Sequence, residues 1–513
     1  MTPDPPSNAR PGAADRWADL APALAVLALH LAFARGYGVF RDEMYYLACG
    51  RHLAWGYVDH PPLVALVARL AGALFGTWLP GLRLFPALAH AAATWQTARL
   101  AGDLGGGRFA RLLAGAALAL TPVALSIASI LSMNALDLLF WVLLFRLATR
   151  LLAGGDPRWA LAFGAVAGVG LLDKISILFV GFGIVVGLVA CRRWDLLRSK
   201  WFWTGGALAA LLFAPHLLWQ QLHGWPTLEF MDRARRLKML EFSAPGFLGE
   251  SAIQSGASVL VWLPGLLWML VSRPARTFRP LAIAFLAVLA LLVATHGKPY
   301  YLAPAFAAPL AAGGVAWERW TAARPRLGRG LVLAAVVLGN AVFAPLAMPI
   351  LGADRLVAYA AALGRAPGSD ERHELGRLPQ FFADMHGWRD LARDVSKVYR
   401  QLPEGERSRA CVFGQNYGEA GAIDFFRGEF PLPPAISAHN SYWIWGPGDC
   451  SGEVLLVLAD RRERLEELFE QVELGGVHEC VDCMPYENHL PIWVVRRARQ
   501  PVERIWPAIK SFI

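Results

Sequence analysis

The sequence predicts an all-α polytopic membrane bundle followed by a C-terminal α/β or α+β domain outside the membrane. Of its 513 residues, 56% are hydrophobic and only 17% are charged, with a mean hydropathy of +0.39, whereas soluble domains carry about 25% charged residues. Residues 1–351 hold 30 Lys/Arg and 16 Asp/Glu, and residues 352–513 hold 19 and 24. We therefore expect the first part in lipid and the second in water. The net charge of +9 is the sum of a basic first part and an acidic second part, so it does not indicate nucleic-acid binding.

Eleven apolar runs, give or take two, are expected to span the bilayer, which takes about 20 mostly apolar residues in a helix. Prolines in several runs are tolerated where neighbouring helices satisfy the freed backbone groups. The first run lacks a small-residue cleavage site, which indicates an uncleaved anchor. The expected parts are a cytoplasmic tail at 1–19, a membrane domain at 20–351 and an outer domain at 352–513. The runs lie near 20–40, 82–101, 109–125, 135–153, 159–173, 175–191, 202–219, 251–271, 280–295, 302–320 and 330–350.

Positive charge sets the expected orientation of the bundle. If the N-terminus is cytoplasmic, the inside loops hold sixteen Lys and Arg residues, all on alternate connections. This agreement with the positive-inside rule over five loops supports both the number of spans and their direction. The C-terminal domain then lies outside the cytoplasm.

The first outer loop, about residues 41–80, places two adjacent carboxylates, Asp42 and Glu43, directly after the first predicted span. Ionisable groups at membrane depth are costly, so they usually line a polar cavity that has a function. The alternative is that both residues cap the next helix and pair with Arg41 or Arg51, because acids are common in a first helical turn. Both interpretations remain open.

A second polar group in this loop is Asp59-His60-Pro61-Pro62, which makes a rigid turn before a helix expected to start at Leu63. Helix starts attract anions. A single histidine is more often structural, but the neighbouring acid and the shared loop strengthen the case for a functional site.

Three further polar sites interrupt apolar sequence on the same predicted side of the membrane. Lysines and tyrosines at membrane edges are commonly interface anchors. Their convergence on one face favours instead a site for a phosphate at lipid-headgroup depth. Asp173 and Lys174 are expected to form an ion pair at this boundary. The residues are Asn134 and Asp137, Asp173 and Lys174, and Lys298, Tyr300 and Tyr301.

The outer loop at 220–250 departs from the charge rule, because it carries Arg233, Arg235, Arg236 and Lys238 among apolar residues. Their spacing predicts a basic amphipathic helix that lies in the interface and holds an anionic lipid headgroup. The alternative is a solvated flank of a membrane span.

The tail mixes a helical stretch at 388–402 with β-rich segments such as 454–458 and 492–495, which predicts an α/β or α+β domain. Four of the six cysteines lie here. Cys480-Val-Asp-Cys483 supplies only half of a zinc site, so a disulfide is favoured, with Cys450 as a further partner. The fourth cysteine of the tail is Cys411.

Five stretches of the membrane part occur in a characteristic order: Arg-Asp-Glu-Met-Tyr-Tyr-Leu-Ala at 41–48, Trp-Gly-Tyr-Val-Asp-His-Pro-Pro-Leu at 55–63, Ser-Met-Asn-Ala-Leu-Asp at 132–137, Gly-Leu-Leu-Asp-Lys at 170–174 and Gly-Lys-Pro-Tyr-Tyr-Leu-Ala-Pro at 297–304. In these stretches the chain resembles the bacterial branch of the dolichyl-phosphate-mannose protein O-mannosyltransferase superfamily. These are GT-C membrane glycosyltransferases, of the kind grouped as glycosyltransferase families 39 and 83. They include the aminoarabinose transferase of lipid A and the rhizobial galacturonosyltransferases of lipopolysaccharide. The tail resembles the outer domain of bacterial members at 413–424, 439–442 and 483–488.

The resemblance implies a GT-C fold of about eleven to thirteen transmembrane helices in a bacterial inner membrane, with the C-terminal domain in the periplasm. It implies a polyprenyl-phosphate-linked sugar as donor and no nucleotide cofactor. The acceptor is expected to be lipid A or lipopolysaccharide, another glycan, or a protein. In the tail, Asn416, Tyr417 and Tyr442 either shape the acceptor site or belong to a scaffold.

The resemblance also implies roles for single residues. Asp42, with Glu43 beside it, is the catalytic candidate, because the acceptor hydroxyl must lose its proton as it attacks the anomeric carbon. A lipid phosphate leaves without protonation, so one carboxylate suffices, and inverting single displacement is expected. The resemblance gives Lys174 and Lys298 as donor-phosphate candidates, with Tyr300 and Tyr301 as hydrogen-bond donors. The first outer loop and the basic helix add His60, Arg235 and Arg236 as further candidates. The other active-site candidates are Arg41, Tyr45, Asp59, Asn134 and Asp137.

Two positions depart from the aminoarabinose enzymes. This chain has Tyr45 where they have arginine, and Asp59-His60 where they have Glu-Lys. The identity of the sugar is therefore open. Asp59 and His60 supply two ligands for a divalent cation, which is too few to define a metal site.

Two other functions fit some of these features. A transporter or flippase of a lipid-linked sugar would be expected to show related halves and polar breaks near the bilayer midplane. Here the polar sites gather on one face, which favours the enzyme. A glycan polymerase or ligase that uses pyrophosphate-linked donors is the second alternative.

Overall fold

The computed structural model describes residues 13–369 and 371–513. Most of the predicted cytoplasmic tail at 1–19 lies outside the described residues. The chain forms two compact units. The first contains the described residues up to Ala34, together with Arg83–Leu217 and Glu241–Ile350. The second combines Arg35–Leu82, Leu218–Leu240 and Leu351–Ile513. The membrane and periplasmic boundaries given above stay predictions.

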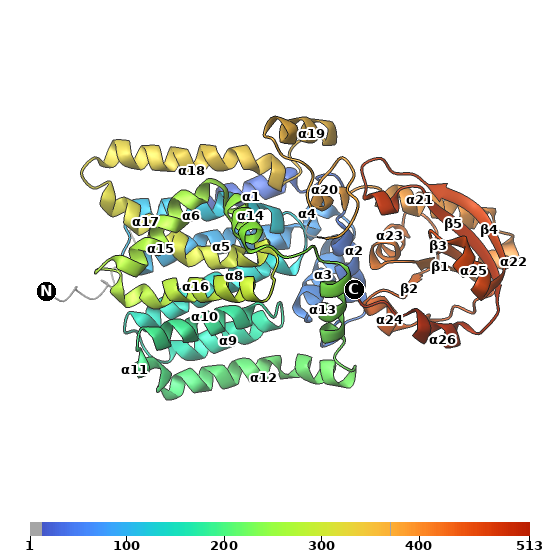
Figure 1. The fold of residues 1–513 in the computed structure, drawn as a ribbon, viewed down its shortest axis with the longest axis horizontal. Helices are drawn as coiled ribbons and strands as arrows, with labels where there is room; N and C mark the ends of the chain where they lie inside the picture. The colour runs from blue at the N-terminus through green and yellow to red at the C-terminus, as the bar shows by residue number, and fades with distance from the viewer. Residues whose placement is uncertain (1–12, 370) are drawn as a thin grey trace. The chain divides into compact units, whose positions relative to one another are not determined.

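The first unit is helical throughout its described part (Figure 1). Each of the eleven predicted apolar runs falls on helices, which confirms the helical bundle, while the number of membrane spans stays a prediction. Its α-helices are α1 (Ala13–Phe33), α5 (Leu84–Asp103), α6 (Arg108–Leu120), α7 (Pro122–Ile127), α8 (Met133–Leu152), α9 (Trp159–Leu171), α10 (Ile177–Ala190), α11 (Trp194–Leu197), α12 (Lys200–Leu222), α14 (Ala244–Ser255), α15 (Val259–Val271), α16 (Arg279–Ala294), α17 (Ala307–Trp320) and α18 (Pro325–Ala347).

Five spans in the described part of the chain are long and apolar enough to cross a membrane: Arg16–Phe33, Lys200–Leu222, Ala244–Val271, Arg276–Ala294 and Pro325–Ala347. Small residues allow close packing between the helices of this unit, as is usual in lipid. A Cβ built on Gly205 of α12 would lie only 2.2 Å from the carbonyl oxygen of Ala160 in α9.

The first span is shorter than predicted. Helix α1 ends at Phe33, and a turn separates it from the short helix α2 (Arg41–Arg51). Asp42 and Glu43 therefore do not emerge directly from the first span, as the run at 20–40 suggested. They lie in the first turn of a separate helix, because apolar composition continues across a glycine-rich turn that breaks the helix.

The second unit joins loop helices to the tail domain. The loop helices are α2, α3 (Leu63–Phe75), α4 (Leu79–Leu82) and α13 (Pro226–Leu237). The tail contains α19 (Ala353–Ala362), α20 (Gln380–Ala383), α21 (Trp388–Gln401), α22 (Glu404–Arg407), α23 (Tyr417–Phe426), α24 (Ser441–Trp445), α25 (Arg462–Leu468) and α26 (Val502–Ile505).

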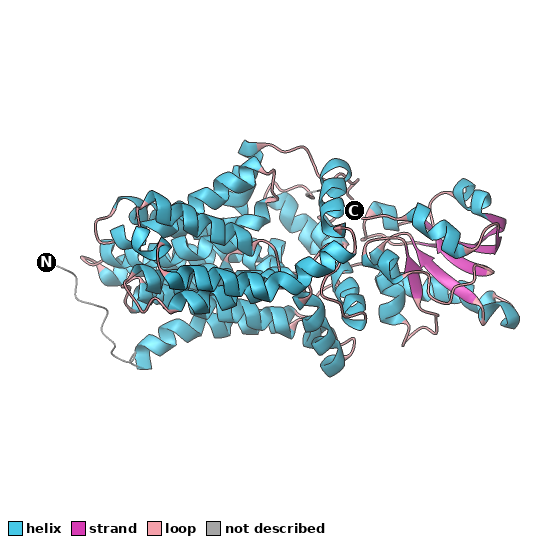
Figure 2. Ribbon diagram, turned by 90° about the horizontal axis from the view of Figure 1, so that it is seen from below, coloured by secondary structure: helices cyan, strands magenta, loops and turns pink. Residues whose placement is uncertain are grey.

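A five-stranded mixed sheet forms the centre of the tail, shown in magenta in Figure 2. The strand order is β2-β1-β3-β5-β4. The first three strands in this order pair in parallel, and β5 pairs antiparallel with both β3 and β4. Parallel neighbours need a crossover, which α23 supplies between β1 and β2. The strands are β1 (Ala410–Gly414), β2 (Ala435–Ser437), β3 (Val454–Leu458), β4 (Phe469–His478) and β5 (Leu490–Ala498).

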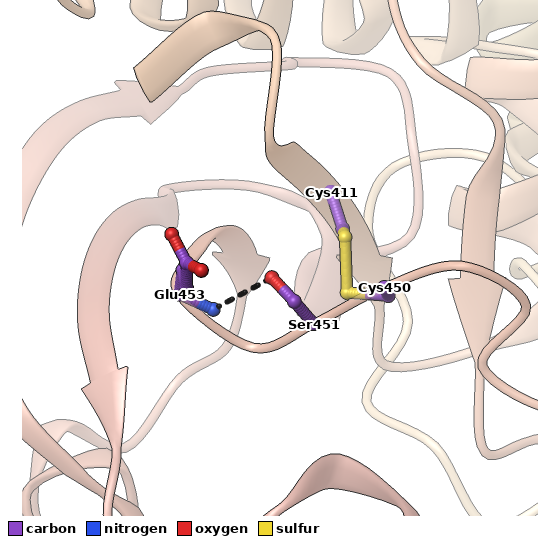
Figure 3. The surroundings of a disulfide bond; sticks show 4 residues. All are labelled: Cys411, Cys450, Ser451 and Glu453. Atoms are coloured by element: carbon purple, nitrogen blue, oxygen red, sulfur yellow. Dashed lines mark hydrogen bonds between the residues drawn. A yellow bond between two sulfur atoms is a disulfide. The ribbon is translucent and has the colours of Figure 1, made fainter. Parts of the chain in front are cut away.

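The tail contains one disulfide among the described residues, between Cys411 on β1 and Cys450 ahead of β3 (Figure 3). Neither Cys480 nor Cys483 is disulfide-bonded. The expectation of a disulfide through these two residues is therefore wrong for this structure, while Cys450 does form a disulfide, with Cys411 as its partner. Strand pairing explains the difference, because β1 and β3 are neighbours and bring Cys411 close to the segment that holds Cys450.

Candidate active site

Helix α2 separates the two carboxylates at its start. Glu43 is fully buried, and its Oε2 accepts a hydrogen bond from the backbone N–H of Phe40 at 2.8 Å, which caps the helix. The side chain of Asp42 is 31% exposed. The capping interpretation thus applies to Glu43, and the interpretation as an accessible functional carboxylate applies to Asp42.

Asp42 is held by groups from both α2 and the tail. The Tyr417 hydroxyl donates to Asp42 Oδ1 at 2.8 Å, and Arg41 Nε lies 3.5 Å from the same oxygen. The Arg41 guanidinium also donates to the Tyr486 hydroxyl at 3.0 Å and pairs with Asp384 at 3.5 Å. Charge-assisted bonds of this kind restrict the side chains that make them. Asp42 is therefore an accessible carboxylate with a defined orientation.

The position of Tyr417 follows from local chemistry at the carboxyl end of β1. Asn416 caps α23, because its Oδ1 accepts hydrogen bonds from the N–H groups of Gly418 at 2.8 Å and Glu419 at 3.0 Å. Two glycines then let α23 approach α2 closely. A Cβ built on Gly418 would lie 2.7 Å from Arg41 Cγ, and one on Gly421 would lie 3.1 Å from Met44 Cβ.

Tyr45 and Asp59 form a second hydrogen-bonded pair in this unit. The buried Tyr45 hydroxyl donates to Asp59 Oδ1 at 2.8 Å, and the Ser441 hydroxyl lies 2.8 Å from the tyrosine oxygen. The ring of Tyr45 packs on that of Tyr417, with centroids 4.6 Å apart. Burial raises the pKa of the Asp59 carboxyl, while His60 and the bond from Tyr45 oppose the rise.

His60 is buried between aromatic rings. It stacks on Tyr57 at 4.6 Å, and its Nδ1 lies 2.8 Å from the Pro61 carbonyl oxygen. Within the described residues, its Nε2 has no hydrogen-bond partner. Burial lowers the pKa of this imidazole, which the Asp59 charge opposes.

The first unit brings a second set of predicted residues together. Lys174 Nζ donates to Asn134 Oδ1 at 2.7 Å and lies 3.5 Å from Asp137 Oδ2. It also lies 5.6 Å from the ring centroid of Tyr300 and 4.9 Å from that of Tyr301. Four candidates from two other motifs thus converge on the ammonium group of Lys174.

The ion pair of Lys174 differs from the expected one. Lys174 pairs with Asp137 and not with its sequence neighbour Asp173. The other carboxylate oxygen of Asp137 accepts a hydrogen bond from the Ser176 hydroxyl at 2.5 Å. Both carboxylate oxygens of Asp173 are buried and have no hydrogen-bond partner among the described residues. Adjacent residues in a turn point in different directions, so sequence proximity did not predict the pair. Lys298 directly precedes the 3₁₀ segment Pro299–Phe306, which carries both tyrosines.

The basic loop forms α13, as predicted, but part of its charge is paired. Arg236 forms an exposed ion pair with Asp232 at 2.5 Å, and Arg233 lies 3.8 Å from Glu229. Exposed ion pairs of this kind contribute little to stability. Arg235 is exposed, as are Leu228 and Met231. Exposed apolar and basic groups together are typical of a helix at a membrane interface.

Sequence reasoning missed several groups around Arg41. Asp384 precedes α21 in a segment with no recognisable pattern, and Tyr486 and Glu487 were noted only as part of a tail motif. Asn416 donates from its Nδ2 to both Glu419 and Glu487, at 2.9 Å each. Burial raises the pKa of both carboxyls. Burial also raises the pKa of Asp384 to about 6, although Arg41 opposes the rise.

These buried acids predict that stability falls as pH rises. A carboxyl whose folded pKa is raised contributes stability below its unfolded pKa, near 4, and loses it as pH rises through the folded value. For Asp384 the loss falls between about pH 4 and pH 6. We expect the melting temperature of the detergent-solubilised protein to drop over this range, and Asp384→Asn to flatten the curve. Asp354→Asn, at an exposed ion pair, should leave it unchanged. A wild-type curve that rises over this range would contradict the prediction.

The comparisons with known proteins agree with this architecture. Residues 59–219 match the family model described as dolichyl-phosphate-mannose-protein mannosyltransferase. Among solved structures, ArnT from Cupriavidus metallidurans bound to undecaprenyl phosphate is similar at 15% identity and a TM-score of 0.60, covering 93% of this chain and 97% of that one. Its apo state is similar at 16% identity and a TM-score of 0.61, covering 94% and 98%. The comparison with curated proteins finds no match.

The chain has a GT-C fold with a small C-terminal sheet domain, which confirms the predicted fold class. The family match over residues 59–219 and this fold together support the resemblance to GT-C membrane glycosyltransferases. The resemblance found in the sequence motifs is thereby confirmed at the level of the fold.

Proposed function

We propose that the protein transfers a sugar from a polyprenyl-phosphate donor to an acceptor hydroxyl at the periplasmic face of a bacterial inner membrane. Asp42 acts as the general base. The observation that carries this proposal is the environment of Asp42, an accessible carboxylate fixed by Tyr417 and Arg41. A base needs this combination, because it must reach the acceptor proton and already be oriented toward it.

The chemistry needs one carboxylate and at least one cation. As the acceptor oxygen attacks the anomeric carbon, Asp42 takes its proton and the lipid phosphate leaves as an anion. Tyr417 occupies Oδ1 of Asp42, which leaves Oδ2 for the acceptor. Single displacement inverts the anomeric configuration.

The cations for the donor phosphate are assigned to Lys174 and Lys298, with Tyr300 and Tyr301 as hydrogen-bond donors. Support comes from the residues around Lys174. Its ammonium group has three donor hydrogens, and it donates one to Asn134 and forms an ion pair with Asp137. The structural neighbour ArnT was solved with undecaprenyl phosphate, which supports a lipid monophosphate donor here. His60, Arg235 and Arg236 remain further candidates, with α13 placed at the lipid headgroups.

Mass spectrometry of envelope lipids, glycans and glycoproteins from cells with and without the protein tests this function. We expect one mass difference that corresponds to a sugar and disappears in cells that produce Asp42→Asn. Accumulation of the sugar-linked lipid monophosphate should accompany the loss. Transport of a labelled lipid across vesicles, with no glycosylated product, would instead identify a flippase. Consumption of a lipid diphosphate would identify the polymerase or ligase alternative.

Tyr417→Phe tests whether the tail orients the base. Loss of the phenol hydroxyl leaves the ring packing in place and frees Asp42 to rotate, so we expect kcat to fall about 10- to 100-fold with little change in KM. Tyr399→Phe is the matched control, because its hydroxyl donates to the Arg407 carbonyl within the tail, away from α2. If KM rises while kcat is retained, Tyr417 contacts a substrate and does not orient the base.

A further inference from the structure

Cys480 and Cys483 lie in the loop that joins β4 to β5. Cys480 is half-buried, and Cys483 is buried. The thiol of Cys483 donates to the Cys480 carbonyl oxygen at 3.1 Å, and a Cβ built on Gly387 would lie 2.8 Å from the Cys480 sulfur and 3.4 Å from Cys483 Cβ. Two free cysteines therefore lie close together in a domain that already carries the Cys411–Cys450 disulfide.

The two thiols have different surroundings. His478 lies two residues before Cys480, and its Nδ1 is bonded to Asp394 Oδ2 at 2.9 Å. The hydrogen bond from Cys483 lowers the pKa of Cys480 to about 5, against the effect of burial and with help from His478. The pKa of Cys483 is raised by the same contact and by burial. Cys480 is thus the more accessible and more nucleophilic sulfur, and Cys483 is the sheltered one.

The same loop contacts the residues that hold Arg41. A Cβ built on Gly387, at the start of α21, would lie 2.8 Å from the Cys480 sulfur. The turn before Gly387 carries Asp384, which pairs with Arg41, and the cysteine loop carries Tyr486, which accepts a hydrogen bond from Arg41. The two cysteines therefore pack near the segment that carries Asp384 and share a loop with Tyr486, the two residues that contact Arg41.

We propose that Cys480 and Cys483 form a thiol–disulfide exchange site whose redox state changes how Arg41 is held. The oxidant is a disulfide, either of a small thiol or of a protein disulfide oxidoreductase. The Cys480 thiolate attacks one sulfur of that disulfide, whose S–S bond breaks to release one thiol and leave a mixed disulfide. Cys483 then loses its proton and attacks the Cys480 sulfur, which releases the second thiol. Two cysteine thiols are oxidised to one disulfide while the partner disulfide is reduced to two thiols.

Oxidised glutathione serves as the probe for the purified full-length protein, with intact mass and peptide mapping as readouts. We expect the wild type to form the Cys480–Cys483 disulfide. Cys483→Ser should trap one glutathione on Cys480, and Cys480→Ser should react at least about tenfold more slowly. Cys191→Ser, which removes a cysteine from the membrane part, should behave as the wild type. Equal reactivity of Cys480 and Cys483, or no adduct on Cys483→Ser, would overturn the exchange site.

The coupling to Arg41 has its own measurement, which does not depend on the reaction the protein catalyses. Hydrogen exchange of peptides that cover residues 41–45 and 384–390 is compared between the reduced and the oxidised protein. We expect faster exchange in one redox state, because the sulfur that packs on Gly387 changes partner. A second comparison in Tyr486→Phe should show a smaller difference in residues 41–45. Identical exchange in both redox states would disprove the coupling while leaving the disulfide chemistry intact.

Discussion

Replacement of Asp42 by asparagine is expected to reduce sugar transfer by at least about 10³-fold while the protein still folds and inserts. Asparagine is nearly isosteric and still accepts a hydrogen bond from Tyr417, so the contacts at Oδ1 persist. It cannot take a proton, and general-base catalysis is commonly worth about 10²–10⁴-fold. Transfer to acceptor from a synthetic polyprenyl-phosphate sugar in detergent or vesicles measures the effect, with the donor KM expected to change little.

Two comparisons make the Asp42 result specific. Asp354→Asn removes an exposed carboxylate from the same unit and should retain transfer. Asp42→Asn combined with Tyr417→Phe should be no worse than Asp42→Asn alone, because the tyrosine acts through the carboxylate. Full activity of Asp42→Asn would remove this residue from the chemistry and, with it, the proposed mechanism.

Lys174→Met is the second substitution with a large expected effect. It removes the cation assigned to the donor phosphate and leaves Asp137 buried without its ion pair. Breaking a buried pair by removing one partner typically costs about 3–5 kcal/mol. We therefore expect both a lower melting temperature and a loss of transfer of at least about 10²-fold.

A double variant separates these two effects of Lys174. Lys174→Met with Asp137→Asn removes the uncompensated charge and should recover most of the thermal stability. It should not recover transfer, since the phosphate still lacks its cation. If transfer returns together with stability, Lys174 only balances the charge of Asp137 and the donor phosphate is bound elsewhere.

Local sequence predicted the membrane helices well and their ends less well. Apolar composition over about 20 residues reports the free energy of burial in lipid, which does not depend on the rest of the fold. The end of a helix depends on turn and capping contacts. Helix α1 therefore stops at Phe33 and not at 40, and Glu43, not Asp42, became the capping residue of α2.

Contacts between residues that are distant in sequence could not be predicted from local sequence patterns. The motifs identified Asp42 and Tyr417 separately, but their hydrogen bond joins residues 375 positions apart. Lys174 was expected to pair with Asp173 and pairs with Asp137. Asp384 had no signal at all, because a single acid before a helix is common and only the fold places it beside Arg41.

By itself, the sequence determined the class of the protein: a bundle of apolar helices, a more highly charged C-terminal domain, and polar motifs that resemble GT-C glycosyltransferases. These properties follow from composition and short patterns, which act locally along the chain. Only the tertiary structure decided which carboxylate is accessible, which tyrosine orients it and which acid pairs with Lys174. Such pairings depend on the crossover of α23, the close approach that Gly418 and Gly421 permit, and the turn after α9, all of which form only when distant segments pack.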